Sequence, residues 1–337
     1  MSIVVLLLPL FLLLLFILAL ALIVFKKWKL ALACLVVLCV INVYYEVIPI
    51  NLFSKNERKG ISLITYNINS SNSSFSSDST LQSRLLSNLL EEEADIVVLN
   101  EYYKRYCTEE FHSGLFNSYP YYYREKNGSP NVIFSKYPIV QAEEMFVEKN
   151  SELGQKINNV IESDSSRFYK EYRCLSKLSI ETPNGDLGLY PCHLTSPNFD
   201  RITKYSDKYS NLWKRFNAQI DSYKAGELLR LCEAEWLLDR INNRPKSPTL
   251  ICGDFNEVSG GRSIKLIQSE ANLIDAWWEK GCGLGLTYHG HKIMHFRLDH
   301  VLHSKEISIN SIEVLDWNYS DHKPLMITFD IKRKDNE

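Results

Sequence analysis

The sequence predicts an α/β (α+β) fold in which two β-sheets pack face to face, with helices outside and two transmembrane helices in front. Residues 61–332 hold many short apolar, β-prone stretches, and segments with helical spacing of apolar residues separate them. Within residues 174–194, the pair Asn184-Gly185 is typical of a tight hairpin turn. A hairpin needs antiparallel neighbours, so it argues against an all-parallel sheet, although local patterns alone leave a doubly wound sheet open.

The first 50 residues predict a membrane anchor. Ile3–Phe25 is apolar and uncharged, interrupted only by Pro9, and about 20 such residues span a bilayer. A second apolar stretch at residues 30–50 is weakened by Asn42 and Glu46, which leaves an interfacial helix as the alternative there. We therefore expect two transmembrane helices, at about residues 3–25 and 30–50, joined by a tight basic turn.

The basic residues around these spans predict how the protein sits in the membrane. The turn carries Lys26, Lys27 and Lys29, and cytoplasmic loops are usually rich in Lys and Arg. We expect an integral membrane protein with this turn inside and the large domain on the non-cytoplasmic side. The anchor at residues 1–50 would be followed by a linker at 51–60 and a folded domain at 61–332.

Charge and cysteine spacing exclude some functions for this domain. Without Lys26, Lys27, Lys29 and Glu46, residues 51–337 hold 35 basic and 39 acidic residues, a net charge of −4. A domain that grips nucleic acid phosphates is usually basic, so nucleic acid is not the favoured partner. The six cysteines beyond residue 100 show no zinc-finger spacing, which argues against a zinc site.

The expected elements follow one another along the domain. We expect strands at residues 63–66, 95–100, 131–139 (with a turn at Tyr137-Pro138), 174–194 (a hairpin), 249–252, 296–304, 307–316 and 324–331. We expect helices at residues 81–93, 211–243 and 263–271, with a polar loop at 70–80. The longest helix would bury one apolar face, formed by Leu228, Leu231, Ala234, Leu237, Leu238 and Ile241.

Two strands end in a pair of polar residues two positions apart. Asn67 and Asn69 follow the first strand, and Asp254 and Asn256 end the stretch "LICGDFNEVSG". Residues i and i+2 of a strand point to the same side, so each pair would project together, and Gly253 would allow a close approach. The alternative is an Asx-type turn, in which the side chains only cap the backbone.

Other strand ends carry further polar residues. Glu101 follows "DIVVLN", His193 lies in "GLYPCHL", Asp299 lies in "FRLDHVL", and Asp321 and His322 precede the last strand. Taken singly, these residues have ordinary explanations, such as a solvated acid, a core histidine or a turn cap. Asp299 is harder to explain, because burying an unpaired carboxylate is costly.

Together these residues are suited to the hydrolysis of phosphate esters. Mg²⁺ prefers oxygen ligands, and Glu101, Asp321 and the amide of Asn67 supply them. His193, Asn67 and Asn256 would donate hydrogen bonds to phosphate oxygens, and Asp254 would orient or deprotonate the attacking water. Asp299 would pair with His322 and favour its charged form.

The chain resembles the endonuclease/exonuclease/phosphatase (DNase I-like) superfamily. The stretches that carry the resemblance are "TYNIN", "DIVVLNE", "PCHL", "ICGDFNE", "RLDHVL" and "SDHKPL", in the family's order over residues 61–329. The resemblance implies a four-layer sandwich of two mixed sheets flanked by helices, with the site at their common edge. It also implies dependence on Mg²⁺ or Mn²⁺, with Asn67, Glu101 and Asp321 at the metal. His193, Asp254, Asn256, Asp299 and His322 would be catalytic.

Some positions depart from the family's pattern. Asn100 stands where many members have Gln before the glutamate, and Asn69 stands where some nucleases have an aspartate near the metal. Thr287 resembles a threonine that contacts substrate phosphate in some relatives. The resemblance therefore implies Asn69 and Thr287 as substrate-binding residues.

Three functions remain open from the sequence. The anchor and the acidic domain favour a membrane-anchored, divalent-metal-dependent phosphoesterase that cleaves a phosphodiester or phosphomonoester by in-line attack of activated water. Its substrate would be a lipid head group or a phosphorylated small molecule. The alternatives are a nonspecific exported endonuclease acting on DNA or RNA, and an inactive binding module. Filled positions at Glu101, Asp254 and His322 disfavour the inactive module.

Overall fold

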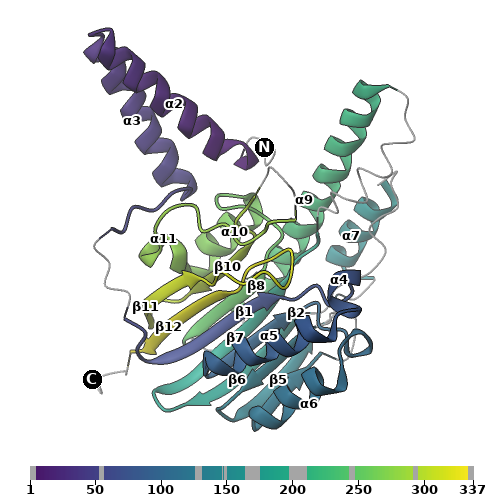
Figure 1. The fold of residues 1–337 in the computed structure, drawn as a ribbon. Helices are drawn as coiled ribbons and strands as arrows, with labels where there is room; N and C mark the ends of the chain where they lie inside the picture. Colours follow the sequence, from purple (N-terminus) through teal and green to yellow (C-terminus); the bar gives the residue numbers. More distant parts are fainter. Residues whose placement is uncertain are drawn as a thin grey trace.

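The folded domain consists of two six-stranded mixed β-sheets packed face to face, with helices covering the outer faces (Figure 1). The computed structural model describes residues 5–52, 57–125, 131–145, 147, 150–163, 175–196, 211–242, 247–290 and 295–332. This arrangement confirms two packed mixed sheets flanked by helices, and the doubly wound single sheet is not found.

The first sheet has the strand order β11-β12-β1-β2-β4-β3. Its strands are β1 (Ile61–Asn67), β2 (Ile96–Asn100), β3 (Tyr121–Arg124), β4 (Val132–Ser135), β11 (Ile307–Val314) and β12 (Leu325–Ile331). β1 is parallel to β2, with Asn67 opposite Asn100, and antiparallel to β12.

The second sheet has the order β5-β6-β7-β8-β10-β9. Its strands are β5 (Ile139–Met145), β6 (Leu175–Thr182), β7 (Gly185–His193), β8 (Thr249–Asp254), β9 (Ile274–Asp275) and β10 (Asp299–His303). β8 is parallel to β7, with His193 opposite Asp254, and antiparallel to β10, with Asp299 opposite Asp254. Each sheet therefore has a central strand, β1 or β8, that ends beside the end of a parallel neighbour.

Apolar residues that alternate along the strands hold the two sheets together. The inner core includes Leu63 and Val98 from the first sheet and Leu189 and Leu250 from the second. Ile64 points to the other side and packs beneath the outer helices. Each fully buried aliphatic side chain contributes about 1.5–3 kcal/mol, so this core fixes the positions of the strand ends.

The helices form the two outer layers. α4 (Ser73–Ser76), α5 (Ser79–Glu91) and α6 (Glu109–Ser118) lie on the side of the first sheet, with the 3₁₀ turn η1 (Lys104–Tyr106) between α5 and α6. α9 (Leu212–Asn242) and α10 (Arg262–Ala271) cover the second sheet, and α7 (Glu152–Ser163) packs on α9. The short helix α11 (Ala276–Lys280) packs at the end of the inner core.

The N-terminal segment forms a hairpin of two apolar helices, α2 (Leu8–Val24) and α3 (Trp28–Tyr45), which projects from the domain (Figure 1). In the described part of the chain, only α3 is long and apolar enough to cross a membrane by length and composition. The prediction of two such spans is therefore corrected to one. Pro9 is the physical reason, because it lacks an N–H and starts α2 in the first helical turn, which leaves α2 with 17 residues.

Residues 131–139 differ from the single strand with a turn that the sequence predicts. β4 ends at Ser135 in the first sheet, and β5 begins at Ile139 in the second. The turn at Tyr137-Pro138 therefore carries the chain from one sheet to the other. The local pattern shows the turn but not the change of sheet, because the choice of strand partner depends on residues distant in the chain.

The long helix α9 also differs in part from its predicted apolar face. Leu228 is 46% exposed, whereas Arg230 and Glu233 are buried. The buried face therefore includes charged residues, because Arg230 and Glu233 bind the backbone beside β7. The helical spacing of apolar residues does not reveal these two residues, because it identifies only apolar side chains as buried.

Candidate active site

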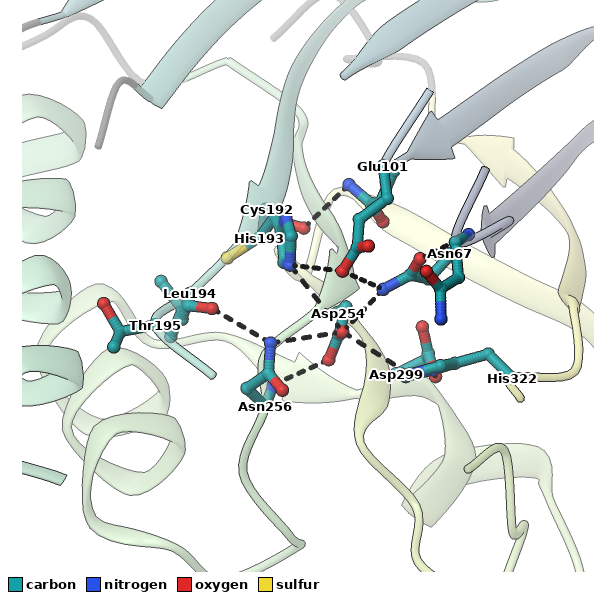
Figure 2. A network of polar contacts seen from close by, with 12 residues as sticks. Asn67, Glu101, Cys192, His193, Leu194, Thr195, Asp254, Asn256, Asp299 and His322 are labelled. Atoms are coloured by element: carbon teal, nitrogen blue, oxygen red, sulfur yellow. Dashed lines mark hydrogen bonds and ion pairs between the residues drawn. The ribbon is translucent and has the colours of Figure 1, made fainter. Parts of the chain in front are cut away.

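The polar residues at the strand ends come together at one edge of the sandwich. Figure 2 shows the side chains of Asn67, Glu101, His193, Asp254, Asn256, Asp299 and His322 pointing toward one another. The cluster forms because β1, β2, β7 and β8 all end at this edge, while β10 and β12 begin there. The sheet topology thus joins segments that are far apart in the sequence.

The carboxylate of Asp254 lies at the centre of the cluster, and the residue is only 1% exposed. Its Oδ2 accepts hydrogen bonds from Asn67 Nδ2 at 3.0 Å and from Asn256 Nδ2 at 3.2 Å. The same oxygen lies 3.7 Å from His322 Nε2 and 3.9 Å from His193 Nε2. Burial raises the pKa of Asp254 to about 7, against the opposing charge of His322. A carboxyl group that titrates near neutral pH is suited to take a proton from water.

Asp299 and His322 form a buried pair. His322 Nδ1 lies 2.8 Å from Asp299 Oδ2, and neither residue is more than 4% exposed. Burial lowers the pKa of His322, but the carboxylates of Asp299 and Asp254 outweigh that effect and raise it to about 10. The imidazole is therefore charged at neutral pH, and its Nε2 side faces Asp254.

The start of β10 holds Asp299 in place. Asp299 is the first residue of β10 rather than an interior strand residue. Its N–H and that of Leu298 both donate to Thr287 Oγ1 at 3.1 Å, and Thr287 is fully buried. In the structure, Thr287 therefore positions Asp299. A contact of the Thr287 hydroxyl with substrate stays a prediction.

The acids on the side of the first sheet are more open to solvent. The side chain of Glu101 is 26% exposed, and Asn67 Nδ2 donates to its Oε1 at 3.2 Å. Asp321 is half-buried and accepts a hydrogen bond from Asn69 Nδ2 at 3.0 Å. Glu101 and Asp321 therefore offer oxygens at the open part of the cluster.

Both strand ends with paired polar residues form the Asx-type turn that the sequence left as an alternative. Asn69 N–H donates to Asn67 Oδ1 at 3.0 Å, and Asn256 N–H donates to Asp254 Oδ1 at 2.8 Å. Asn69 and Asn256 have positive φ values of 41° and 50°, so neither pair remains extended. Oδ2 of Asp254 still points into the cluster. The turn therefore orients the side chain through Oδ1 and leaves Oδ2 available to the site.

Gly253 allows a close approach, as its sequence position suggests. Its φ is +138°, and a Cβ there would lie 2.0 Å from the carbonyl oxygen of Cys192 and 3.1 Å from Asn100 Oδ1. What comes close is the neighbouring strand β7 and the amide of Asn100, which bonds to Cys192 O. Asn100 thereby links the two sheets directly behind the site.

Buried polar residues of α9 position the segment that follows His193. Thr195 N–H and Oγ1 donate to the two carboxylate oxygens of Glu233 at 2.8 and 2.7 Å, and Arg230 Nη1 donates to Thr195 O at 3.0 Å. His193 Nε2 lies 3.5 Å from Glu101 Oε1, and the residue is 7% exposed. These contacts hold His193 between the carboxylates of the two sheets.

The donor set fits a divalent cation. Glu101, Asp254, Asp299 and Asp321 share the cluster with one charged imidazole, and a cation would balance the excess negative charge. Glu101 and Asp321 provide partly exposed carboxylates, which suit Mg²⁺. Asn67 presents its Nδ2 to the carboxylates while its Oδ1 accepts from Asn69, so its service as an oxygen ligand stays a prediction.

A second group of candidate ligands lies deeper in the site. Asp254, Asp299 and His322 each offer an atom within 4.8 Å of the others, and all three are buried. However, Nδ1 of His322 is engaged by Asp299, and Nε2 lies beside Asp254. The Asp299–His322 hydrogen bond favours a part in proton transfer and charge stabilisation over metal binding for this group.

Comparisons with known proteins agree with this fold. The model of the endonuclease/exonuclease/phosphatase family matches residues 64–322. A family protein from Bacteroides thetaiotaomicron has a TM-score of 0.55 at 14% identity, covering 81% of this chain and 98% of that chain. TDP2 from D. rerio, solved with a single-strand DNA product, has a TM-score of 0.55 at 16% identity, covering 80% and 98%.

A third solved structure widens the range of relatives. The mannosyl-6-phosphatase of Bacteroides thetaiotaomicron has a TM-score of 0.53 at 14% identity, covering 80% of this chain and 99% of that chain. At these identities the structural matches show a shared fold alone. The comparison with curated protein sequences gave no match.

The fold and the family match define a class of hydrolases that act on phosphoester bonds and are built on a two-sheet α/β sandwich. Because the family model covers more than half of the sequence, the chain belongs to the endonuclease/exonuclease/phosphatase family. The family match begins within β1 and ends at His322, so it includes every residue of the polar cluster, from Asn67 to His322.

Proposed function

We propose that this protein is a membrane-anchored, divalent-metal-dependent phosphoesterase that cleaves a phosphodiester or phosphomonoester by in-line attack of water. The observation that carries the proposal is the Asp299–His322 pair facing Asp254 at the end of β8. A charged imidazole next to a carboxyl group that titrates near neutral pH supplies both charge stabilisation and a proton acceptor.

The roles of the residues follow from their positions. Asp254 takes a proton from the attacking water, whose oxygen bonds to phosphorus opposite the leaving oxygen as the phosphorus–leaving-oxygen bond breaks. His322 faces the negative charge that develops on the phosphate oxygens. His193, Asn67 and Asn256 would supply hydrogen-bond donors around the same position. The leaving oxygen takes up a proton from solvent water, and Asp254 releases to solvent the proton that it took.

A divalent metal ion would be held at the open part of the site. Glu101 and Asp321 would be its carboxylate ligands, with the amide of Asn67 beside them, and the ion would be Mg²⁺ or Mn²⁺. When bound, it would supply charge stabilisation at the phosphate oxygens. Asn69 Nδ2 donates a hydrogen bond to Asp321 Oδ1 at 3.0 Å, which would keep this carboxylate oriented.

The α2–α3 hairpin supports the membrane part of the proposal. Most of the exposed large apolar side chains belong to these two helices, among them Phe11 at 46%, Trp28 at 61% and Val40 at 62% exposed. A soluble domain rarely exposes a continuous apolar surface of this kind. We propose that the hairpin is embedded in a membrane, with the catalytic domain on the non-cytoplasmic side.

A nuclease remains the second candidate, and one local feature favours it. Arg105 lies over the rings of Tyr103 and Tyr106, and Lys104 and Arg124 line the same hollow of about 480 Å³, shortly after Glu101 in the sequence. Basic and aromatic side chains together suit single-stranded nucleic acid. The net charge of −4 beyond residue 50 still favours a non-nucleic substrate.

One activity panel separates these candidates. The purified full chain in detergent would be tested on bis-p-nitrophenyl phosphate, phospholipids, sugar phosphates, plasmid DNA and RNA, each with Mg²⁺ and with excess EDTA. We expect Mg²⁺-dependent hydrolysis of a phospholipid or small phosphate ester, with nucleic acid cleaved poorly. Activity confined to DNA or RNA would establish the nuclease. If none of these esters is hydrolysed, both the phosphoesterase and the nuclease are rejected.

A further inference from the structure

The base of the α2–α3 hairpin is bonded to the folded domain. Glu46 directly follows α3 and pairs with Lys265 Nζ at 2.9 Å, and it also accepts a hydrogen bond from Gln268 Nε2 at 2.9 Å. Both partners lie on α10. Two partners on one helix hold this carboxylate in one orientation, so the end of α3 is fixed on α10.

The residues after Glu46 continue the attachment. Gly283 N–H donates to Pro49 O at 3.0 Å, and Ile50 forms a β-bridge with Cys282. Asn51 Nδ2 donates to two carbonyl oxygens at the end of α11, at 3.0 and 2.9 Å. Residues 46–51 therefore form a strap along α10 and α11 rather than a free tether, although the sequence predicts a linker from residue 51.

The strap meets the domain next to the catalytic strand end. Gly260 has a φ of +74°, and a Cβ there would lie 2.6 Å from the carbonyl oxygen of Tyr45. Val258 packs in the same apolar cluster as Val47. Gly260 follows Asn256 by only four residues, so α3 ends against the loop that leaves the active site.

Chain geometry limits the distance between the site and the end of α3. Four extended residues span at most about 14 Å, and Gly260 touches Tyr45, so Asn256 lies within roughly 20 Å of the end of α3. The polar head-group layer of a bilayer is about 5–8 Å thick on each side. If α3 occupies the hydrocarbon core, the active site is held close to the lipid head groups.

The same loop is joined to the catalytic pair. Arg297 Nη2 donates to Ser259 Oγ, and His300 Nε2 lies 2.9 Å from the carbonyl oxygen of Glu257. Arg297 lies two residues before Asp299 in the sequence, and His300 directly follows it. The docked loop and the Asp299–His322 pair are therefore parts of one packed unit.

We infer that the hairpin is a docked element that holds the active site against the bilayer, and that the substrate is a phosphate ester of a membrane lipid. This inference rests on the proposed phosphoesterase function and membrane insertion. It selects the lipid head group over the soluble phosphorylated molecule, because a site fixed within roughly 20 Å of the bilayer core meets lipid phosphates at high local concentration.

The docking is tested by a distance measurement that does not depend on activity. A fluorescent amino acid would replace Ser269 on α10 or Ser118 on α6, two exposed serines that each bond a carbonyl of their own helix. The full chain would be reconstituted in phosphatidylcholine vesicles with a head-group spin-labelled lipid as quencher. We expect quenching at Ser269 to be at least about twofold stronger, because α6 lies beyond both sheets, about 30 Å from α10 at ~10 Å per layer.

The substrate class is tested with a docking variant. E46A combined with N51A removes the bonds to α10 and α11, and E152A combined with K156A removes an exposed pair on α7 as the control. In vesicles of phosphatidylcholine, phosphatidylglycerol and phosphatidic acid, we expect the docking variant to release head groups and phosphate about tenfold more slowly. Its activity on soluble bis-p-nitrophenyl phosphate should stay within about twofold of the unmodified protein, as should both activities of the control.

The outcomes separate the inference from the proposed function. Equal quenching at Ser269 and Ser118 would overturn the docking. Hydrolysis of bis-p-nitrophenyl phosphate without any hydrolysis of vesicle lipids would overturn the lipid substrate. An unchanged lipid rate in the docking variant would overturn the part of the docked hairpin in holding the site against the bilayer. Stronger quenching at Ser269 with no hydrolysis of any ester would leave the docking standing and reject the phosphoesterase.

Discussion

The ends of β1 and β8 share a backbone arrangement but carry different chemistry. At each end, an Asn or Asp accepts the N–H of an Asn two residues later, and that Asn has a positive φ. Each central strand also has a parallel neighbour that ends beside it and an antiparallel neighbour on the other side. The two sheets therefore present equivalent positions to the common edge.

The residues at and next to these positions differ in charge, and Glu101 is more exposed than His193. The first sheet supplies the neutral Asn67 and the partly exposed Glu101, whereas the second supplies the buried Asp254 and His193. The antiparallel neighbours supply His322 before β12 and Asp299 at the start of β10. Apart from the buried His322, the first sheet thus offers the accessible carboxylates of Glu101 and Asp321, and the second offers buried acid–base groups.

The difference shows how one backbone framework produces two kinds of site. The Asx turns and positive φ values fix where the side chains begin, and the amino acids at those positions decide what they do. The proposed reaction would need both halves, because His322 from the first sheet is bonded to Asp299 from the second. The following predictions test that division.

The largest effect should come from breaking the pair that joins the two sheets. His322→Ala should lower kcat by about 10²–10⁴, the usual range for a general acid–base or charge-stabilising group. Asp299→Asn should cost less, because the imidazole remains, and the double variant should be little worse than His322→Ala alone. Steady-state kinetics on folded variants, checked by circular dichroism, would measure this. Full multiplication of the two losses would mean that the residues act independently.

A smaller effect is expected from the open half of the site. Glu101→Gln keeps the size of the side chain but removes its charge, so activity should fall about 10²-fold and the Mg²⁺ concentration for half-maximal rate should rise. The exposed Glu181 of β6, changed to Gln, serves as the control. Full activity of the unmodified protein in excess EDTA would contradict a metal ion at this half.

The two left-handed asparagines should differ in importance. Glycine at either position keeps the positive φ, so only the side-chain bonds are lost. Asn256→Gly removes the bonds to Leu194 O and Asp254 and should lower kcat about tenfold, whereas Asn69→Gly removes the bond to the half-buried Asp321 and should cost about threefold. Steady-state kinetics on both variants would measure the two losses in kcat. Equal losses would mean that the bonds of the two asparagines support activity to the same extent.

The smallest effect concerns the stability of the second sheet. Burial raises the pKa of Asp275, but the charge of Arg297, 3.0 Å away, and His300 outweigh it and hold the pKa well below its usual range. This carboxylate therefore stabilises the fold above its unfolded pKa of ~3.9, and that contribution is lost as pH falls toward the folded pKa.

Urea unfolding should therefore show about 1 kcal/mol less stability at pH ~3 than at pH ~5. Asp275→Asn should show a smaller decrease over this interval, whereas the exposed Asp186→Asn should behave like the unmodified protein. An unchanged decrease in Asp275→Asn would assign the acid sensitivity to other carboxylates.

The sequence alone determined the class of fold and most of the residues at the common edge. Apolar stretches of the right length predicted β1, β2, β8 and β12, and polar residues placed directly after or before them pointed to Asn67, Glu101, Asp254 and His322. This works because strand periodicity and the exclusion of polar groups from a core are local properties, readable from neighbouring residues.

Tertiary structure alone decided how these residues meet and what supports them. Sequence did not show that residues 131–139 change sheets, that Arg230 and Glu233 turn a charged face of α9 inward, or that Thr287 lies behind Asp299. Nor did it show that Glu46 and Asn51 bind the end of the α2–α3 hairpin to α10 and α11. Each of these depends on contacts between segments distant in the chain, whose partners are chosen by the packing of the two sheets and carry no signature in the local sequence.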